Sequence, residues 1–432
     1  MLQRVQKRVH RSEPIDGQRA IPEHRIALMG FLAVTFTSKP STILNWTPIL
    51  SSGRLRLEGT KYTRGAEQPD PETGAIETPI YQTVSYIHPK GERFRYTREA
   101  NPTVATLSQK VALLEEFEAG TSFSSGMAAI TTALLALLSP GATLVTQKDG
   151  FGRSVRFAKD FLARWGVKVR VTPSETDTII SEIEDGCSVV FVESVTNPCL
   201  RVVDLERLAE SAHNGGALLV VDNTLATTYN FKPSKFGADL VIHSASKFLA
   251  GHNDVVAGVA AGKKELVLRL DELRKTLGCS LDPHAAHLVI RGIKTLHVRM
   301  ERINANALAI AQSLQANPRV GGVIYPGLDN HPDHAVAKRL MSGYGGVLSF
   351  YLNTSDKNAY LTFMKSLRLV YPANTLGATE TIVSHPATMS HRGLTEEERR
   401  EIGINWQLMR LSVGLEEKED ILSDLESALA SL

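Results

Sequence analysis

The stretch Ala217–Phe248 reads ALLVVDNTLATTYNFKPSKFGADLVIHSASKF and holds two short apolar runs, each followed at once by polar residues. The runs are Ala217–Asp222 and Leu240–His243. Continuously apolar runs of this length are typical of strands that are buried on both faces of a parallel sheet. Because open α/β sheets bind ligands outside the carboxyl ends of their strands, the polar residues after the two runs are the first candidates for a site.

The pattern continues on both sides of this stretch, where short apolar or β-branched runs alternate with segments of helical period. The further strands that we predict are Ala142–Thr146, Val167–Val171, Ser188–Glu193 and Val255–Ala260, and the helices include Met127–Leu138 and Leu205–His213. This alternation predicts an α/β fold with a mostly parallel sheet and helices on both faces. From about Glu301, a long helix at Arg302–Gln315 and mixed segments after it indicate a smaller α+β domain.

The chain has 432 residues, of which 43% are hydrophobic, and this is enough for two domains with extensions. We predict a basic N-terminal extension at 1–55, an N-terminal arm at 56–115, a large domain at 116–300 and a smaller C-terminal domain at 301–432. The extension carries eight Lys and Arg residues against three acids. Because a transit peptide is Arg-rich and nearly free of acids, we interpret the extension as a disordered tail or as residues upstream of the real start. The transit peptide is the alternative.

Composition excludes several classes of partner and site. A formal net charge of +2 gives no reason to expect nucleic acid or a membrane surface as partner. The three cysteines are scattered, with no C-x-x-C pair, which favours a reduced, cytoplasmic protein. The pairs His284/His287 and His331/His334 have a spacing that could supply half of a metal site. No third ligand accompanies either pair, and we predict no metal.

The residues that carry chemistry lie just after the two apolar runs that open this section. Asp222 ends the first run, and Lys247 follows the second between Ser244 and Ser246. Alone, Lys247 would be an exposed loop lysine, since lysine is almost never fully buried without a partner. Two flanking hydroxyls can hold a phosphate while the lysine forms an imine with an aldehyde, and an acid on the neighbouring strand can keep a pyridine nitrogen protonated. Pyridoxal 5′-phosphate (PLP) requires these parts.

A second phosphate-binding element is predicted at SSGMAA, Ser124–Ala129, which opens a helix. Small residues there let backbone N–H groups approach an anion at the positive end of the helix dipole. Taken alone the signal is weak, because Ser-Gly at a helix start is commonly only a cap. Together with Lys247 and Asp222 it supports a PLP site.

From about Thr60 to the C-terminus, the chain resembles the trans-sulfuration group of PLP-dependent enzymes: cystathionine γ-synthase, cystathionine γ-lyase, methionine γ-lyase and O-acetylhomoserine sulfhydrylase. The resemblance is carried by PDPETGAIETPIYQT (Pro69–Thr83), YTREANPT (Tyr96–Thr103), SSGMAA, ESVTNP (Glu193–Pro198), VDNT, HSASKFLAGHNDVVAG (His243–Gly258), RGIKTLHVRME (Arg291–Glu301), SHPATMSH (Ser384–His391) and RLSVGLEE (Arg410–Glu417). It implies the fold of aspartate aminotransferase (fold type I), PLP as cofactor and an active homodimer or homotetramer whose N-terminal arm contacts the partner subunit.

The resemblance also implies a role for individual residues. Lys247 would carry PLP covalently and move protons of the substrate, and Asp222 would pair with the pyridinium nitrogen. Asn197 would contact the ring O3′ or the region of the substrate carboxylate, which Arg410 would bind, with Thr375 near the lysine and the substrate. The phosphate would be bound by Gly126, Met127, Ser244 and Ser246 of one subunit and by Tyr96 and Arg98 of its neighbour.

Two departures from the family pattern bear on the reaction. The family usually has Asp-x-Tyr-Gly-Gly-Thr where this chain reads Asp149-Gly150-Phe151-Gly152-Arg153-Ser154. Phe151 keeps the aromatic face that stacks on the cofactor but lacks the phenol, and Arg153 adds a charge near the substrate entrance. Asn374 stands where many cystathionine-handling members have Glu.

We therefore expect γ-elimination or γ-replacement on sulfur-containing or homoserine-derived amino acids, of the cystathionine γ-lyase or γ-synthase type. Methionine γ-lyase or O-acetylhomoserine sulfhydrylase activity is the alternative. A non-catalytic PLP-binding protein is a remote alternative, suggested by Phe151 alone, and the retention of Lys247, Asp222 and Arg410 speaks against it.

Overall fold

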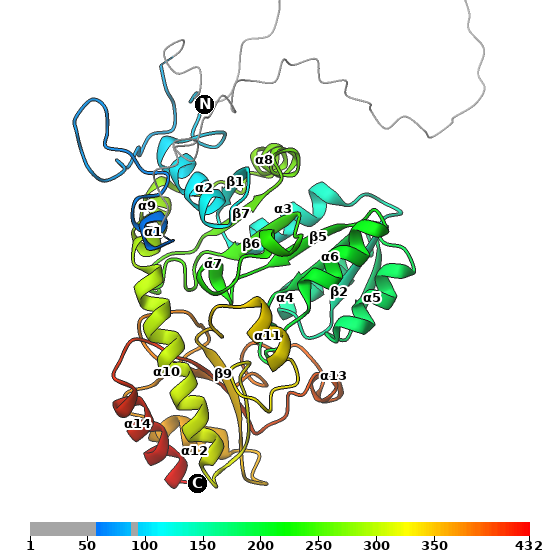
Figure 1. The fold of residues 1–432 in the computed structure, drawn as a ribbon, viewed down its shortest axis with the longest axis vertical. Helices are drawn as coiled ribbons and strands as arrows, with labels where there is room; N and C mark the ends of the chain where they lie inside the picture. The colour runs from blue at the N-terminus through cyan, green and yellow to red at the C-terminus, as the bar shows by residue number, and fades with distance from the viewer. Residues whose placement is uncertain (1–57, 88–93) are drawn as a thin grey trace, which may run out of the picture. The chain divides into compact units, whose positions relative to one another are not determined.

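Two β-sheets organise the part of the chain that the computed structural model describes, residues 58–87 and 94–432 (Figure 1). The predicted extension at 1–55 lies outside the described residues. The first sheet has seven strands in the order β1-β7-β6-β5-β4-β2-β3. The strands are β1 (Ala119–Phe123), β2 (Thr143–Gln147), β3 (Lys168–Thr172), β4 (Val189–Glu193), β5 (Leu218–Asp222), β6 (Leu240–Ser244) and β7 (Gly258–Gly262).

The predicted mostly parallel sheet is confirmed. β3, β2, β4, β5 and β6 run parallel to their neighbours, and β7 is antiparallel to both β6 and β1. The predicted strand Val255–Ala260 is wrong at its start, because β7 begins at Gly258 and Val256 is 65% exposed. Only glycine fits at position 258, since a Cβ atom would lie 2.0 Å from the carbonyl oxygen of Ser125. β1 was not predicted because its sequence, AGTSF, contains no apolar run.

Helices cover both faces of the seven-stranded sheet. Alternate residues of a strand point to opposite faces: Val190 and Val192 of β4 pack with one set of helices, and Val189 and Phe191 pack with the other. The first set is α2 (Pro102–Leu114), α5 (Thr176–Glu184) and α6 (Leu205–Asn214). The second is α3 (Gly126–Leu137), the π-helical turn η2 (Phe157–Leu162) and α8 (Lys264–Leu277). Because both faces are covered, the strands read as continuous apolar runs.

The second sheet follows the order β10-β11-β12-β9-β8, as expected for the smaller α+β part. Its strands are β8 (Val320–Ile324), β9 (Val347–Leu352), β10 (Tyr371–Pro372), β11 (Ile382–Ser384) and β12 (Leu408–Ser412). Its core joins α10 (Leu296–Ala316), α12 (Ala359–Ser366) and α14 (Lys418–Ala430). The long helix that we predicted from Arg302 begins at Leu296, so the predicted domain limit at 300/301 falls inside α10.

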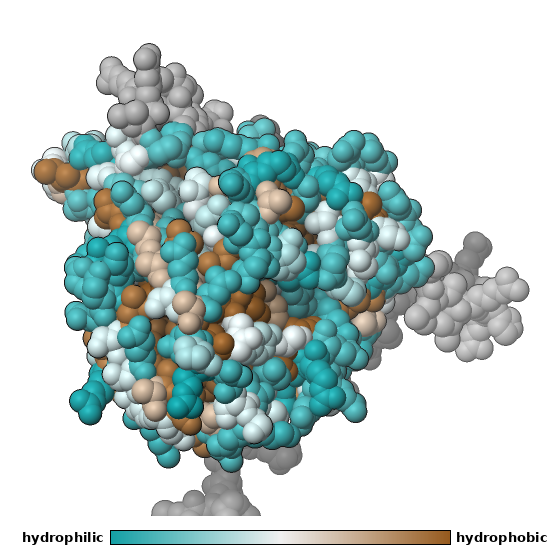
Figure 2. All heavy atoms as spheres, turned by 60° about the horizontal axis from the view of Figure 1, so that its bottom comes forward, coloured by the Kyte–Doolittle hydropathy of each residue, from teal (hydrophilic) through white to brown (hydrophobic). Residues whose placement is uncertain are grey.

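The remaining helices are short or connect the two sheets. They are α1 (Glu58–Arg64), α4 (Gly152–Arg156), α7 (Thr227–Asn230), the 3₁₀ turn η3 (Pro233–Phe236), α9 (Pro283–Lys294), α11 (His334–Leu340) and α13 (Glu396–Glu401). On the face shown in Figure 2, hydrophobic residues lie in small groups among hydrophilic ones. Within the described ranges, no helix is both long enough and apolar enough to cross a membrane.

Candidate active site

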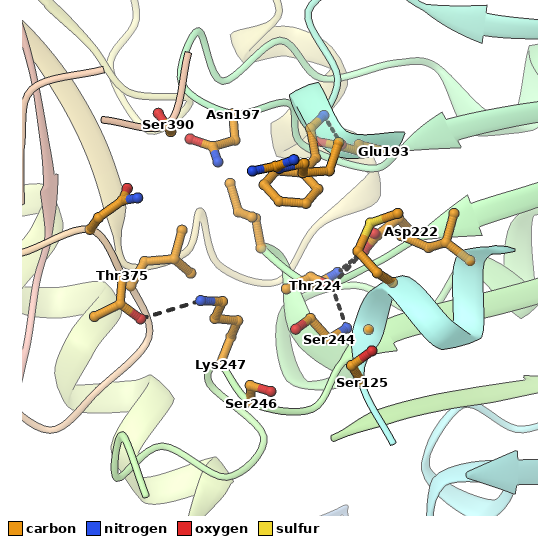
Figure 3. Close-up of a pocket in the computed structure, with 18 of the residues that line it drawn as sticks. Ser125, Glu193, Asn197, Asp222, Thr224, Ser244, Ser246, Lys247, Thr375 and Ser390 are labelled. Atoms are coloured by element: carbon orange, nitrogen blue, oxygen red, sulfur yellow. Dashed lines mark hydrogen bonds between the residues drawn. The ribbon is translucent and has the colours of Figure 1, made fainter. Parts of the chain in front are cut away.

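A cavity of about 700 Å³ lies at the carboxyl ends of β4, β5 and β6 (Figure 3). The second sheet contributes its other side, through the segments 374–376 and 388–392 and through β12. Most of the predicted site residues line this cavity: Gly126, Met127, Phe151, Asn197, Asp222, Ser244, Ser246, Lys247, Thr375 and Arg410. Tyr96 and Arg98 do not. The sheet therefore brings together residues from distant parts of the sequence at the edge where open α/β sheets bind ligands.

Lys247 lies in the turn after β6 and extends into the cavity. Its Nζ donates a hydrogen bond to Oγ1 of Thr375 at 3.2 Å (Figure 3). Burial, and then the charge of Arg410, lower the pKa of Lys247. Gly377, at φ +81°, lets the Thr375 segment pack closely, because a Cβ atom there would lie 3.2 Å from Cα of Lys247. The structure thus holds an amine that loses its proton more readily than an exposed lysine, as a nucleophilic lysine requires.

An anion cradle lies at the start of α3. Ser125 is the N-cap, and its hydroxyl accepts a hydrogen bond from Ala128 N at 3.0 Å. At Gly126 a Cβ atom would lie 2.7 Å from Cβ of Ser244, so only glycine lets the first turn of α3 approach β6 this closely. Ser246, after β6, accepts from Ala257 N at 2.9 Å. Free N–H groups of a helix N-terminus and two serine hydroxyls together suit a phosphate.

Asp222 is the acid at the end of β5, and Thr224 orients it. Oδ1 of Asp222 accepts hydrogen bonds from N and Oγ1 of Thr224, at 2.9 and 2.5 Å. Oγ1 of Thr224 in turn accepts from N of Ser244 at 2.8 Å. Burial raises the pKa of Asp222, while the Thr224 hydrogen bonds and the nearby His243 oppose this rise. The hydrogen bonds fix the carboxylate so that its other oxygen can face a positively charged nitrogen.

Glu193, which the sequence analysis did not single out, is a second buried acid in the cavity. It ends β4 as Asp222 ends β5, and this shared position was the signal that could have found it. One carboxylate oxygen accepts the backbone N–H of Phe151. Burial and the neighbouring Asp222 raise the pKa of Glu193 well above its usual range. Glu193 therefore anchors the Phe151 segment through its backbone N–H.

Arg410, on β12, is buried and partly unsatisfied. Its Nη1 donates to Oδ1 of Asn197 at 2.9 Å and its Nη2 to the carbonyl oxygen of Thr375 at 3.1 Å. Its Nε has no hydrogen-bond partner within residues 58–87 and 94–432. Burial lowers the pKa of Arg410 to about 10. A buried guanidinium with unused donors suits a carboxylate, because its planar fork binds both oxygens.

Tyr96 and Arg98 lie away from the cavity of their own subunit. Tyr96 is 41% exposed, and the guanidinium of Arg98 lies 5.5 Å from the centroid of its ring. Nη1 of Arg98 donates to the carbonyl oxygen of Lys275 at 2.7 Å. The two side chains therefore contribute nothing to the phosphate end of the site that this chain forms by itself.

The cavity also contains polar residues to which the sequence analysis gave no role. Thr224, Thr388, Ser390 and Arg392 line it, as do Arg153 and Asn374, which both depart from the family pattern. No group of three or more His, Cys, Asp or Glu residues that could hold a metal ion occurs in the described part of the chain.

Comparison with known proteins agrees with this site. Residues 59–430 match the family described as Cys/Met metabolism PLP-dependent enzyme. The chain belongs to this family. It is 41% identical over 374 residues to the L-methionine gamma-lyase of Fusobacterium nucleatum subsp. nucleatum, covering 83% of this chain and 94% of the relative. It is 40% identical over 378 residues to the cystathionine gamma-lyase of Bacillus subtilis, covering 86% and 99%.

Solved structures lead to the same family. The cystathionine gamma synthase from Xanthomonas oryzae pv. oryzae, in complex with aminoacrylate and cysteine, matches with a TM-score of 0.84 and 36% identity, over 87% of this chain and 98% of that one. The chain is thus a PLP-dependent enzyme of sulfur amino-acid metabolism with the type I fold. Relatives named lyase and synthase match about equally, so similarity does not select one reaction.

The lining fits the cofactor of the family. The cradle at Gly126, the amine of Lys247 and the fixed carboxylate of Asp222 correspond to the phosphate, the aldehyde and the pyridine nitrogen of PLP. When bound, PLP supplies an electron sink for charge that develops on the carbon atoms of an amino acid.

Proposed function

We propose that this enzyme catalyses γ-elimination or γ-replacement of the cystathionine γ-lyase or γ-synthase type, with Lys247 as the residue that carries PLP and moves the substrate protons. The observation that carries the proposal is the position of Nζ of Lys247, in the cavity and 3.2 Å from Thr375. Arg410 and Asp222 line the same cavity. A carboxylate site, a base and an acid for the ring nitrogen therefore surround one space.

Each residue then has a distinct task. Arg410 holds the substrate carboxylate, and Asn197, which accepts from Arg410, fixes the guanidinium for it. Asp222, which Thr224 fixes, would hold the ring nitrogen of PLP, and its negative charge would favour the protonated ring. Burial lowers the pKa of Lys247, so its amine can act as a base. It moves the protons on Cα and Cβ of the substrate. Thr375 positions the amine of Lys247 by accepting its hydrogen bond.

Phe151 leaves the proton transfers to Lys247. Its ring lines the cavity and is positioned through its backbone by Glu193, but it carries no proton that it could donate. The ring would therefore only stack on the cofactor. The side chain has no group that could take over the role of the phenol that family members usually have here.

Methionine γ-lyase or O-acetylhomoserine sulfhydrylase activity is the second candidate, and Asn374 favours it. Asn374 lines the cavity at the position where many cystathionine-handling members have Glu. An amide cannot form an ion pair with the distal ammonium of cystathionine. Asn374 therefore speaks against strict specificity for cystathionine.

One experiment distinguishes these reactions. The purified holoenzyme is incubated with cystathionine, methionine, O-acetyl-L-homoserine or O-succinyl-L-homoserine, each with and without cysteine or sulfide, and 2-oxobutyrate and cystathionine are measured. Lyase activity gives 2-oxobutyrate without a thiol, and replacement gives cystathionine or homocysteine only with one. If none of the substrates reacts, the proposal is wrong and the protein binds PLP without this chemistry.

We further propose that the active unit is a homodimer, paired into a tetramer, in the cytoplasm. Support for the dimer comes from residues 76–87 and 94–96, where large apolar side chains are exposed, including Ile76, Val84, Ile87 and Tyr96. Exposed apolar groups of this kind are typical of subunit interfaces. Tyr96 and Arg98 lie outside the cavity of their own chain, where a partner could use them. The location rests on the cysteines at 187, 199 and 279, which are all free.

A further inference from the structure

A buried arginine on α10 has no acidic partner. Arg299 is 4% exposed, and it forms no ion pair with any residue in the described ranges. Burial lowers its pKa to about 10, and no nearby acid opposes this effect. Arg274 is buried to a similar degree but pairs with Asp271 at 2.9 Å. Because a buried charge is costly unless it is paired or hydrogen-bonded, the hydrogen bonds of Arg299 indicate its task.

Those hydrogen bonds hold the turn that follows Lys247. Nη1 of Arg299 donates to the carbonyl oxygen of Phe248 at 2.8 Å, and Nη2 donates to that of Leu249 at 3.3 Å. Nη2 also donates to the carbonyl oxygen of Gly292, in α9, at 2.7 Å. Phe248 and Leu249 are buried, and buried carbonyl oxygens need a donor. Arg299 thus ties the two residues after Lys247 to α9.

The packing of the turn is shaped around this guanidinium. At Gly251, where φ is +75°, a Cβ atom would lie 2.2 Å from Nη1 of Arg299. At Gly292, a Cβ atom would lie 2.2 Å from the carbonyl oxygen of Ala250. Two glycines therefore let α9 and Arg299 approach the turn closely. From this turn the side chain of Lys247 extends toward Thr375 (Figure 3).

We propose that Arg299 is a positioning residue for Lys247, because it fixes the turn from which the amine reaches the cofactor. The inference rests on the proposed role of Lys247 and adds a residue outside the cavity lining. Nζ of Lys247 bonds to the aldehyde carbon of PLP with loss of one water molecule, and this bond requires a defined distance and direction. Ser246 is held separately, since it accepts from Ala257 N at 2.9 Å. A looser turn would therefore displace the amine more than the phosphate site.

The test compares PLP with pyridoxamine 5′-phosphate, which has the same ring and phosphate but no aldehyde. The Kd of each is measured by fluorescence titration of the apoenzyme. Arg299→Gln should raise the Kd of PLP by about 10-fold, because hydrogen bonds from a charged donor are lost, and that of pyridoxamine phosphate by less than about 2-fold. Arg299→Lys keeps the charge and should show a smaller rise for PLP. Arg302→Gln is the matched control on the same helix, where Arg302 pairs with Glu417 at 2.6 Å, and it should change neither Kd.

A Lys247→Ala background separates positioning from a general structural effect. Without the amine no bond to PLP forms, so adding Arg299→Gln should change the Kd of PLP by less than about 2-fold. If Arg299→Gln raises both Kd values alike, or raises the Kd of PLP equally with and without Lys247, the inference is wrong while the proposed function stands. If the wild type binds PLP no more tightly than pyridoxamine phosphate, the proposed role of Lys247 itself fails.

Gly251→Ala tests the same inference without removing the arginine. The added methyl group displaces the guanidinium of Arg299 from the turn. This variant should therefore raise the Kd of PLP more than that of pyridoxamine phosphate, as Arg299→Gln does. Together with Arg299→Lys, it decides the question if Arg299→Gln does not fold. A folded Gly251→Ala enzyme with an unchanged Kd of PLP would overturn the inference.

Discussion

Glu193 and Asp222 lie side by side at the carboxyl ends of β4 and β5, where their Cα atoms are register partners. Both side chains are buried, and both line the same cavity. Two carboxylates so close in a buried place cannot easily both be charged. Asp222 accepts two hydrogen bonds from Thr224, which favour its charged form, whereas Glu193 accepts one, from the Phe151 backbone. The negative charge that the ring nitrogen needs is therefore placed on Asp222.

This arrangement predicts how Glu193→Gln changes stability with pH. The pKa of Glu193 is higher in the folded protein than its unfolded value of about 4.5, so its contribution to stability is fully present below that value and is lost as pH rises toward the folded pKa. Glutamine cannot ionise and keeps an oxygen for Phe151 N. The difference in Tm, variant minus wild type, should therefore rise between pH 5 and pH 8 in thermal unfolding scans of the holoenzyme. A difference that is constant or falls over this range would contradict a raised pKa.

Lys247 is predicted to be the residue that carries the cofactor. The protein as purified should be yellow, and reduction with borohydride should fix the pyridoxyl label to the peptide that contains Lys247. Lys247→Ala should lose the covalent label and at least about 10²-fold of activity, because the base is gone. Lys263, which is outside the cavity and pairs with Asp239, gives the matched control in Lys263→Ala. A label on another lysine of the wild type would refute the assignment.

The cradle at α3 is tested by Gly126→Ala. The added methyl group would lie 2.7 Å from Cβ of Ser244, so α3 must move away from β6 and its N–H groups from the phosphate. We expect the Kd of PLP, measured by fluorescence titration of the apoenzyme, to rise about 10-fold or more, in line with the cost of overpacking. Gly321→Ala serves as the control, since its nearest neighbour would be 3.8 Å away. Equal Kd values for the two variants would argue against the cradle.

The shared site is tested by complementation between inactive subunits. Lys247→Ala lacks the base, and Arg98→Ala lacks the guanidinium that we expect to serve the partner's phosphate. In a mixed dimer one site has lost both residues and the other is intact, so mixing should restore up to about half of the wild-type activity per mixed dimer. Activity is measured before and after subunit exchange, which is followed by mass spectrometry. Verified exchange with no recovery of activity would mean that Arg98 acts within its own subunit or not at all.

The sequence predicted the parts of the site that follow buried strands. Asp222 and Lys247 were found because each follows a buried strand and because, with Ser244 and Ser246, they supply the parts that PLP requires. Glu193 has the same position and was missed, because its role appears only when β4 and β5 are seen as neighbours. Arg392 could not be found from local pattern at all, since a loop arginine gains meaning only from the cavity that it lines. The start of β7 was predicted too early, at Val255 instead of Gly258. The close packing of Gly258 against Ser125, and not apolar character, sets where this strand begins.

Phe151 leads to the last prediction, because it is the place where the chain lacks a group that its family usually has. The ring lines the cavity, and the bond from its N–H to Glu193 holds the backbone, so Phe151→Tyr should place a phenol without moving the segment. A phenol can protonate a leaving group, and such acid catalysis contributes about 10²–10⁴-fold when it acts. The thiolate of cystathionine needs this help more than the carboxylate that leaves an O-acyl homoserine.

We therefore expect Phe151→Tyr to raise kcat for cystathionine cleavage by about 10²-fold and to change kcat for O-acyl homoserines little. Both values come from steady-state rates of 2-oxobutyrate release. Phe161→Tyr is the control, because Phe161 is 45% exposed and lies outside the cavity lining. No change with either substrate would show that Lys247 alone suffices for the protons. A fall with both would show that the pocket around Phe151 and Arg153 is built for a bare ring, and the missing phenol would then be an adaptation rather than a loss.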